Sequence, residues 1–256
     1  MFEKGLLRGK RILVTGGGSG LGAATARAMA AKGAKVAVLD QSKENAEKVA
    51  TEVKGLAVVA DVTDEEQVKA AIAGAEAAHG IARVLVNCAG IGGSRRIVGK
   101  DGVYPLAQFA RIINVNLIGT FNCLRLFAER LVTAEPIGEE RGVIINTASV
   151  AAYEGQIGQI AYSASKGGVV GLTLPAARDL AQHKIRVNTI APGLFLTPLL
   201  MGLNEEARKS LGAQVPHPAR LGEPSEYGNL AVHIVENAML NGETIRLDGA
   251  IRMAPR

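Results

Sequence analysis

The sequence predicts an α/β fold in which seven parallel strands form a doubly wound sheet with helices on both faces. Short apolar runs rich in β-branched residues alternate with longer helical segments along the whole chain, an order that is typical of parallel sheets. A glycine-rich turn joins the first apolar run to an alanine-rich helix. No linker rich in proline, serine or charge and no internal repeat divides the 256 residues, so we expect a single domain over residues 1–256.

The composition argues against several classes of protein. With 48% hydrophobic residues the chain can build a large core, yet no apolar run approaches the roughly 18 residues that span a bilayer, so no membrane span is expected. The net charge of +5 comes from dispersed lysines and arginines without interleaved aromatic residues, which fits an anionic cofactor or substrate better than nucleic acid. Cys88, Cys123 and the four histidines show no metal-ligand spacing, so we expect no metal. The cysteine usage and the lack of an apolar signal core favour a reducing, cytoplasmic location.

The first predicted strand, Arg11–Thr15, runs into the turn Thr-Gly-Gly-Gly-Ser-Gly-Leu-Gly and then into a helix that continues through about Lys32. Glycines at Gly16, Gly20 and Gly22 let the backbone turn tightly and approach a pyrophosphate, whose charge the first amides of the helix can meet. A glycine-rich turn can also be only a loop. Its position between a strand and a helix favours a dinucleotide site.

The second predicted strand, Lys35–Leu39, ends in Asp40, which follows Gly16 by 24 residues. A carboxylate at this position can accept hydrogen bonds from the adenosine ribose and repel a 2′-phosphate, which favours NAD over NADP. The alternative is an ordinary helix-capping aspartate. The next predicted elements are a charged helix over Ser42–Lys54, a strand over Leu56–Ala60 that is followed by Asp61 and Val62, and a helix over about Asp64–His79.

A fourth strand, Arg83–Gly90, is followed by a polar, basic and flexible loop over Ile91–Gly102. This loop leaves the carboxyl edge of the sheet, where ligands bind in open α/β sheets. Arg95, Arg96 and Lys100 on this loop are either an anchor for an anionic substrate or solvated surface charges. Both interpretations are open from the sequence.

The long predicted helix from about Leu106 through Val132 contains Asn116. An asparagine within an apolar helix is costly unless its amide has partners. We therefore expect Asn116 to be either a satisfied structural group or the holder of a water molecule at a site.

The main candidate site lies between Ser149 and Lys166. The apolar run Gly142–Ala148 predicts a buried strand, so Ser149 stands at its carboxyl end. Tyr162 and Lys166 are four residues apart and share one face of a helix, where the ammonium is expected to lower the pKa of the phenol and make it a general acid or base. A surface tyrosine beside an unrelated lysine is the common alternative, which the combination with the upstream serine and the glycine-rich turn disfavours.

The sixth predicted strand, Lys184–Ala191, is broken by Pro192 and Gly193. The apolar but loosely patterned segment at about 194–214, which contains Thr197, is expected to be a lid. The last predicted elements are a helix over Pro224–Asn237 and a strand over Glu243–Asp248.

With these motifs in place, the sequence resembles the short-chain dehydrogenase/reductase family, whose members have a Rossmann fold, along nearly its whole length. The glycine turn matches the family's nucleotide loop, and Asn87-Cys88-Ala89-Gly90 matches its Asn-Asn-Ala-Gly motif with cysteine in place of one asparagine. The resemblance implies a catalytic tetrad of Asn116, Ser149, Tyr162 and Lys166. It also implies that the cofactor contacts Gly16, Ser19, Gly20, Leu21, Gly22, Asp40, Asp61, Val62, Asn87, Ala89, Gly90, Tyr162, Lys166, Pro192, Gly193 and Thr197.

Segments of the second half are similar to one branch of that family, the type 2 3-hydroxyacyl-CoA dehydrogenases, some of which also accept hydroxysteroids. This likeness implies an NAD-dependent oxidoreductase of fatty acid metabolism, a homotetramer that interconverts 3-hydroxyacyl-CoA and 3-oxoacyl-CoA. Ser149, Gln156 and Tyr162 would contact the substrate. Tyr162 would exchange the alcohol proton, Lys166 would hold the ribose and Asn116 would anchor a water molecule.

Three other functions are open from the sequence. One is an NADPH-dependent reductase that acts on acetoacetyl-CoA or on a 3-oxoacyl group bound to an acyl carrier. Such reductases usually need a basic residue where Asp40 stands. Another is oxidation of a hydroxysteroid or other secondary alcohol. The third is a non-catalytic dinucleotide-binding scaffold, which the complete tetrad disfavours.

Overall fold

The computed structural model describes residues 7–100, 102–202 and 204–255. Its centre is a seven-stranded sheet in the order β3-β2-β1-β4-β7-β8-β9, and every pairing in it is parallel. The strands are β1 (Arg11–Thr15), β2 (Lys35–Asp40), β3 (Leu56–Val59), β4 (Val84–Asn87), β7 (Gly142–Thr147), β8 (Ile185–Pro192) and β9 (Thr244–Leu247). The strand order turns outward from β1 in one direction and from β4 in the other, so the predicted doubly wound fold is confirmed.

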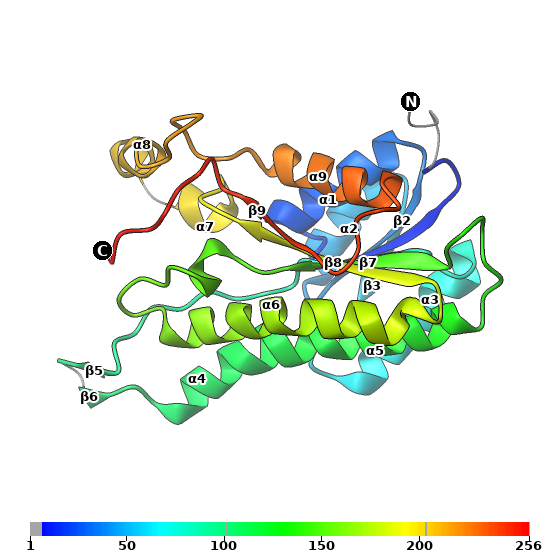
Figure 1. Ribbon diagram of the computed structural model, residues 1–256, viewed down its shortest axis with the longest axis horizontal. Coiled ribbons are helices and arrows are strands. Elements are labelled where there is room, and N and C mark those ends of the chain that lie inside the picture. Colours follow the sequence, from blue (N-terminus) through cyan, green and yellow to red (C-terminus); the bar gives the residue numbers. More distant parts are fainter. Residues whose placement is uncertain (1–6, 101, 203, 256) are drawn as a thin grey trace.

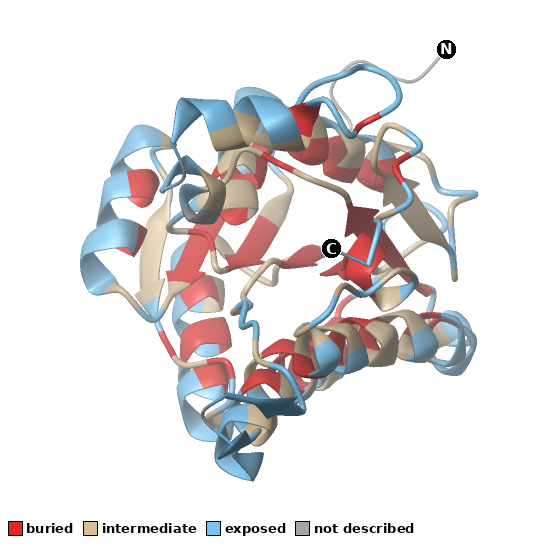
Figure 2. Ribbon diagram, turned by 90° about the vertical axis from the view of Figure 1, so that its left-hand side faces the viewer, coloured by how far each residue is buried: buried red, intermediate tan, exposed pale blue. Residues whose placement is uncertain are grey.

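Helices cover both faces of this sheet, with α1 and α9 above it and α5 and α6 below it in Figure 1. The principal helices are α1 (Gly20–Ala31), α2 (Lys43–Glu52), α3 (Glu65–His79), α4 (Leu106–Ile113), α5 (Gly119–Val132), α6 (Ile160–Ala181) and α9 (Pro224–Glu236). Figure 2 shows the buried residues on the strands and on the inward sides of the helices. Side chains alternate along each strand: Ile12 and Val14 pack in the core beneath α1, α2 and α9, whereas Leu13 packs with α3, α5 and α6. Because both faces are buried, the strands are almost continuously apolar.

The predicted helix over 106–132 is continuous in helical backbone, but a π-helical segment, Asn114–Ile118, separates α4 from α5. Such a wider turn is common at functional sites, and this one contains the fully buried Asn116. Strand β4 is shorter than predicted. It ends at Asn87 because the N–H of Ala89 donates to the side chain of Thr15 instead of to a neighbouring backbone carbonyl.

The loop predicted over 91–102 contains a small antiparallel hairpin of β5 (Val98–Gly99) and β6 (Gly102–Val103). It projects from the body of the molecule beside α4 (Figure 1). The segment at about 194–214 contains two short helices, α7 (Pro198–Met201) and α8 (Glu205–Gly212). Among the described residues, no helix is both long and apolar enough to cross a membrane.

Candidate active site

Tyr162 and Lys166 lie one turn apart on α6, with the Lys166 Nζ atom 5.8 Å from the centre of the tyrosine ring. Burial raises the pKa of Tyr162 above its ordinary value, and a hydrogen bond with Ser149 opposes this shift. The prediction that Lys166 lowers the pKa of Tyr162 below its ordinary value is therefore wrong. Desolvation disfavours the phenolate more strongly than the hydrogen bond stabilises it.

The ammonium group of Lys166 is directed at the backbone. Its Nζ atom donates to the carbonyl oxygen of Thr147 at 2.8 Å, at the end of β7. The side chain is only 4% exposed, and burial lowers its pKa to about 8. At neutral pH Lys166 is thus a buried cation whose charge is stabilised by a carbonyl dipole.

Ser149 follows β7 and is buried beside the tyrosine helix. Its hydroxyl oxygen accepts a hydrogen bond from the N–H of Ala151 at 3.2 Å and caps a short 3-10 turn, Val150–Ala152. This contact fixes the serine side chain while its hydroxyl proton remains available to Tyr162 or to a ligand. The structure thus brings together the serine, the tyrosine and the lysine that the sequence singled out.

The side chain of Asn116 is satisfied by protein groups. Its amide oxygen accepts from the N–H of Ile91 at 2.8 Å, and its amide nitrogen donates to the Ile91 carbonyl and the Ser165 hydroxyl, each at 3.0 Å. These bonds fasten the start of the loop after β4 to the π-helical turn and to α6. Asn116 also lies beside the site, because a Cβ atom built at Gly90 would be 3.3 Å from its amide oxygen and 3.5 Å from Lys166 Nζ.

The backbone of the glycine turn packs so closely against its neighbours that side chains would clash there. A Cβ atom at Gly22 would lie 2.1 Å from the carbonyl oxygen of Gly16, and one at Gly16 would lie 2.7 Å from the backbone of Ala89. Ser19 precedes α1 in extended backbone, and its side chain makes no capping hydrogen bond. The first turn of α1 contains no acidic residue, so no carboxylate offsets the positive end of the helix dipole, which suits an anion.

Asp40, at the end of β2, lies beside the glycine turn. One of its carboxylate oxygens accepts from the N–H of Gly18 at 3.0 Å, and the other accepts from the N–H of Ser42 at 3.0 Å. Both oxygens retain further lone pairs for ribose hydroxyls. Glycines at the turn, a helix amino terminus and a carboxylate at the end of β2 fit a nicotinamide dinucleotide.

The remaining cofactor candidates lie along the carboxyl edge of the sheet. The carboxylate of Asp61 is bonded to the backbone and hydroxyl of Thr63, at 2.9 and 2.8 Å, and the carbonyl of Val62 accepts from Asn122. A Cβ atom at Gly20 would lie 3.8 Å from Thr197, so the segment after β8 faces the glycine turn. The other candidates occupy the ends of β4 and β8 and the start of α1: Leu21, Asn87, Ala89, Pro192 and Gly193.

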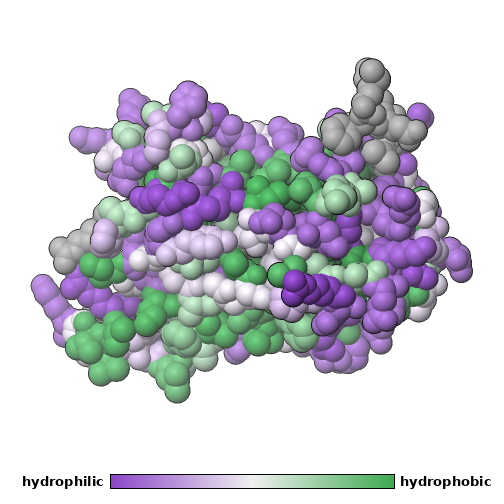
Figure 3. Space-filling model, in the orientation of Figure 1, coloured by the Kyte–Doolittle hydropathy of each residue, from purple (hydrophilic) through white to green (hydrophobic). Residues whose placement is uncertain are grey.

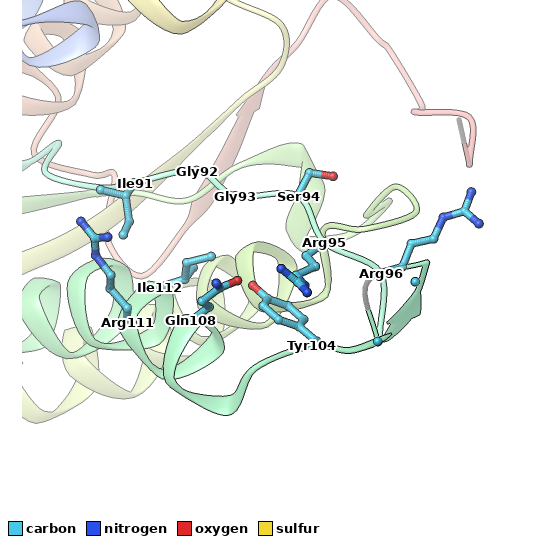
Figure 4. Close-up of a pocket in the computed structure, with 12 residues that line it drawn as sticks. Ile91, Gly92, Gly93, Ser94, Arg95, Arg96, Tyr104, Gln108, Arg111 and Ile112 are labelled. Carbon is cyan, nitrogen blue, oxygen red and sulfur yellow. The ribbon is translucent and has the colours of Figure 1, made fainter.

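A cavity of about 470 Å³ opens beside this edge, between the loop after β4 and α4 (Figure 4). Its lining includes Arg95 and Arg96 from the loop, but Lys100 is not part of it. Arg111 contributes a further arginine from α4, whereas the side chain of Arg96 points away from the other two (Figure 4). Tyr104 and Gln108 also line the cavity.

Sequence reasoning missed Arg111 and Gln108. Their spacing of three residues, which places them on one face of the helix over 106–132, was the available signal. Gln156, expected at the substrate, donates its side-chain N–H to the carbonyl of Ala254 at 3.1 Å. Among the described residues, no group of three or more histidines, cysteines and carboxylates is placed to bind a metal.

Residues 10–208 match the family model of the short chain dehydrogenase. The chain belongs to the short-chain dehydrogenase family. It is 54% identical over 254 residues to 3-hydroxyacyl-CoA dehydrogenase type-2 of Bos taurus, with 97% of each chain covered.

Two solved structures of this family are similar to the protein. The 3-hydroxyacyl-CoA dehydrogenase type-2 of Mycobacterium avium is 43% identical, with a TM-score of 0.92 over 96% of this chain and 97% of that one. The 3-ketoacyl-(acyl-carrier-protein) reductase of Brucella melitensis, complexed with NADH, is 34% identical, with a TM-score of 0.84 over 96% of this chain and all of the other. As a short-chain dehydrogenase the protein is an oxidoreductase that uses a nicotinamide dinucleotide.

Proposed function

We propose that this oxidoreductase interconverts 3-hydroxyacyl-CoA and 3-oxoacyl-CoA with NAD. The observation that carries the proposal is the three-arginine cavity and its attachment to the candidate active site. Ile91, at one end of the cavity loop, is bonded to Asn116, and the N–H of Arg95 donates to the carbonyl of Gly158 at 2.8 Å. The loop is thus tied to two elements that contribute catalytic residues.

The charge of the cavity suits the phosphates of CoA. Arg95, Arg96 and Arg111 form no ion pair with any carboxylate in the described ranges 7–100, 102–202 and 204–255. Guanidinium groups bind phosphate oxygens through paired hydrogen bonds. Exposed apolar side chains surround the mouth of the cavity on the hairpin and at the start of α4, where Figure 3 shows hydrophobic surface at the lower left. They are Ile97, Val98, Val103 and Leu106.

In the proposed reaction Tyr162 accepts the proton of the alcohol during oxidation and returns it during reduction. Ser149 donates to the same substrate oxygen and stabilises the charge that develops there. Lys166 would hold the ribose of the cofactor, which when bound would supply or accept the hydride. Because the Tyr162 pKa is raised, the phenol is protonated at neutral pH and is ready to donate during ketone reduction.

Asp40 supports NAD as the cofactor. It accepts from the glycine turn and from the residue before α2, which holds its side chain at the end of β2, and we expect the carboxylate there to repel a 2′-phosphate. Gln156 is proposed to orient the thioester carbonyl, although its amide nitrogen is bonded to the C-terminal segment. The segment at about 194–214 is proposed to close over the substrate as a lid.

We propose a homotetramer in the cytoplasm. Ile118 in the π-helical turn, Phe121 on α5 and Leu174 on α6 are 48%, 50% and 44% exposed, which supports burial against other copies of the chain. Light scattering after size exclusion tests the assembly, and a monomer would contradict it.

The reaction is tested by following NADH absorbance with 3-hydroxybutyryl-CoA, a longer 3-hydroxyacyl-CoA and a neutral hydroxysteroid. We expect kcat/KM to be greatest with a CoA ester and NAD to be reduced faster than NADP. Turnover of the steroid alone would favour the hydroxysteroid alternative. The similarity to the Brucella melitensis reductase supports a second candidate, reduction of 3-oxoacyl groups, which is tested with acetoacetyl-CoA and NADPH.

A further inference from the structure

Thr147 is the last residue of β7, and its side chain faces the α9 side of the sheet. Its hydroxyl oxygen lies 2.6 Å from the carbonyl oxygen of Asn87 and 2.7 Å from the hydroxyl of Tyr227. Tyr227 belongs to α9 and is fully buried. Hydrogen bonds therefore connect α9, on one face of the sheet, with the ends of the central strands β4 and β7.

The positions of the protons in this contact follow from the groups involved. A carbonyl oxygen can only accept, so the single hydroxyl proton of Thr147 goes to Asn87. The proton between Thr147 and Tyr227 must then come from the tyrosine, whose pKa is raised well above its ordinary value, chiefly by burial. Cys88, whose Sγ atom is 3.8 Å from the Tyr227 oxygen, donates to that oxygen in turn.

The backbone of the same residue faces Lys166. The N–H of Ala148 donates to Ile190 on β8 at 2.8 Å, so the carbonyl of Thr147 in that planar peptide points to the opposite side. On that side the pairing between β7 and β4 ends at Asn87, so the Thr147 carbonyl lies beyond the last paired residue of β4. It accepts from Lys166 Nζ at 2.8 Å instead. Thr147 thus joins α9 to the lysine of α6 across the edge of the sheet.

We infer that Tyr227 and Thr147 are positioning residues for Lys166, with the phenol of Tyr227 holding Thr147 so that its carbonyl faces the ammonium group. This inference rests on the proposed role of Lys166 in holding the cofactor. The same contact fixes the carbonyl of Asn87, where the loop that carries Ala89 and Gly90 leaves the sheet. Neither Tyr227 nor Thr147 is a catalytic residue, because both act through Lys166 and Asn87.

The test compares Thr147→Val, Thr147→Ser and Tyr227→Phe. Valine removes the hydroxyl and leaves Tyr227 without an acceptor, so we expect kcat to fall about tenfold or more and NADH to bind more weakly. Serine keeps the hydroxyl, and we expect both kcat and NADH affinity of the Thr147→Ser variant to remain within about threefold of the wild type. The Phe variant keeps the ring and should fall between the two.

A matched control is available on the same helix. Thr173, two turns along α6 from Lys166, shares a 2.6 Å hydroxyl contact with Thr189 of β8, and both are buried. We expect Thr173→Val to lower the melting temperature without changing NADH affinity or kcat. If the Thr147 and Thr173 variants lost stability alike and neither changed NADH affinity, Thr147 would be purely structural.

The pH dependence of NADH binding, measured by NADH fluorescence, gives a readout that does not depend on the substrate. Cys88 and Tyr162 face Lys166, and Tyr227 lies behind Thr147. Burial raises the pKa of all three, whereas it lowers that of Lys166 to about 8, so Lys166 is the one of these four groups that titrates closest to neutral pH.

A displaced carbonyl stabilises the ammonium less, so the loss of NADH affinity should begin at lower pH in Thr147→Val than in the wild type, and Thr147→Ser should restore the profile. An unchanged profile in Thr147→Val and Tyr227→Phe would overturn the inference. Failure of the CoA substrate would contradict the proposed function and leave this binding test intact.

Discussion

At the scale of single residues, the candidate site is dominated by desolvation. Burial raises the pKa of Tyr162 and lowers that of Lys166, so it favours the neutral form of both groups. The four-residue spacing along the helix indicates that the two side chains are neighbours. It does not show whether the charge of Lys166 or the burial of the phenol has the larger effect on the Tyr162 pKa. The tyrosine is therefore a proton donor at neutral pH, and its use as a base in alcohol oxidation should improve as pH rises.

Tyr162→Phe should keep the fold and NADH affinity and lose nearly all turnover, because it deletes only the transferable proton. In the wild type, kcat for alcohol oxidation should increase from neutral to alkaline pH, whereas ketone reduction should decline only at alkaline pH. Steady-state rates in both directions measure this. Retention of more than about a tenth of the activity by the variant, a loss below about 1.4 kcal/mol, would exclude Tyr162 as the acid or base.

Asp40→Asn should reduce the preference for NAD over NADP by about tenfold or more, because a neutral amide no longer repels the 2′-phosphate. The ratio of kcat/KM for the two cofactors measures the preference. An unchanged ratio would show that Asp40 does not set the cofactor preference and only forms hydrogen bonds with Gly18 and Ser42.

At the scale of elements, the loop after β4 is held in place by hydrogen bonds to other parts of the chain. Ile91, at its start, is bonded to Asn116 in the π-helical turn, and Arg95 is bonded to Gly158 before α6. The helix α4 provides the opposite wall of the cavity. The cavity is thus lined by one stretch of the chain, 91–112, which is anchored to elements that contain candidate catalytic residues.

Neutralising Arg95 or Arg111 with glutamine should raise KM for 3-hydroxybutyryl-CoA by about three- to tenfold and leave kcat for a neutral hydroxysteroid unchanged. The effect should shrink as salt is added, because the screening length is about 8 Å at physiological ionic strength. Lys100→Gln is the matched control, since Lys100 lies on the same loop and outside the cavity lining. Equal losses on both substrates would instead indicate a disturbed loop.

At the scale of the whole molecule, the sheet separates two cores, and buried polar groups connect them at its carboxyl edge. Lys166 is the buried cation of that edge, and its burial opposes folding. Below a pH of about 8, Lys166 is protonated in both the folded and the unfolded chain, so its effect on the free energy of unfolding does not change with pH. Between this pH and the ordinary pKa of about 10.5 the unfolded chain binds more protons, and stability rises with pH.

Lys166→Met should remove this pH dependence. From pH 7 to about pH 10, the unfolding free energy of the wild type should gain about 2 kcal/mol relative to the variant. Urea unfolding of both proteins at several pH values measures the difference, and comparison with the variant cancels the other titrating groups. A constant difference would mean that Lys166 is solvated in the folded protein.

The sequence alone predicted the order of elements, the parallel sheet and the residues of the nucleotide turn. These are local properties: apolar periodicity defines strands and helices, and glycines mark the places where backbone approaches backbone, as at Gly16 and Gly22. The motif that contains Ser149, Tyr162 and Lys166 was visible because its spacing places the groups on one strand end and one helix face.

Only the tertiary structure decided the environment of those groups. Arg111 joined Arg95 because α4 packs beside the loop after β4, and Tyr227 reached Thr147 because α9 covers the end of β7. The sign of the Tyr162 pKa shift depended in the same way on how much water the fold excludes. Contacts and burial of this kind depend on how the elements pack against one another, which the periodicity within each element does not specify.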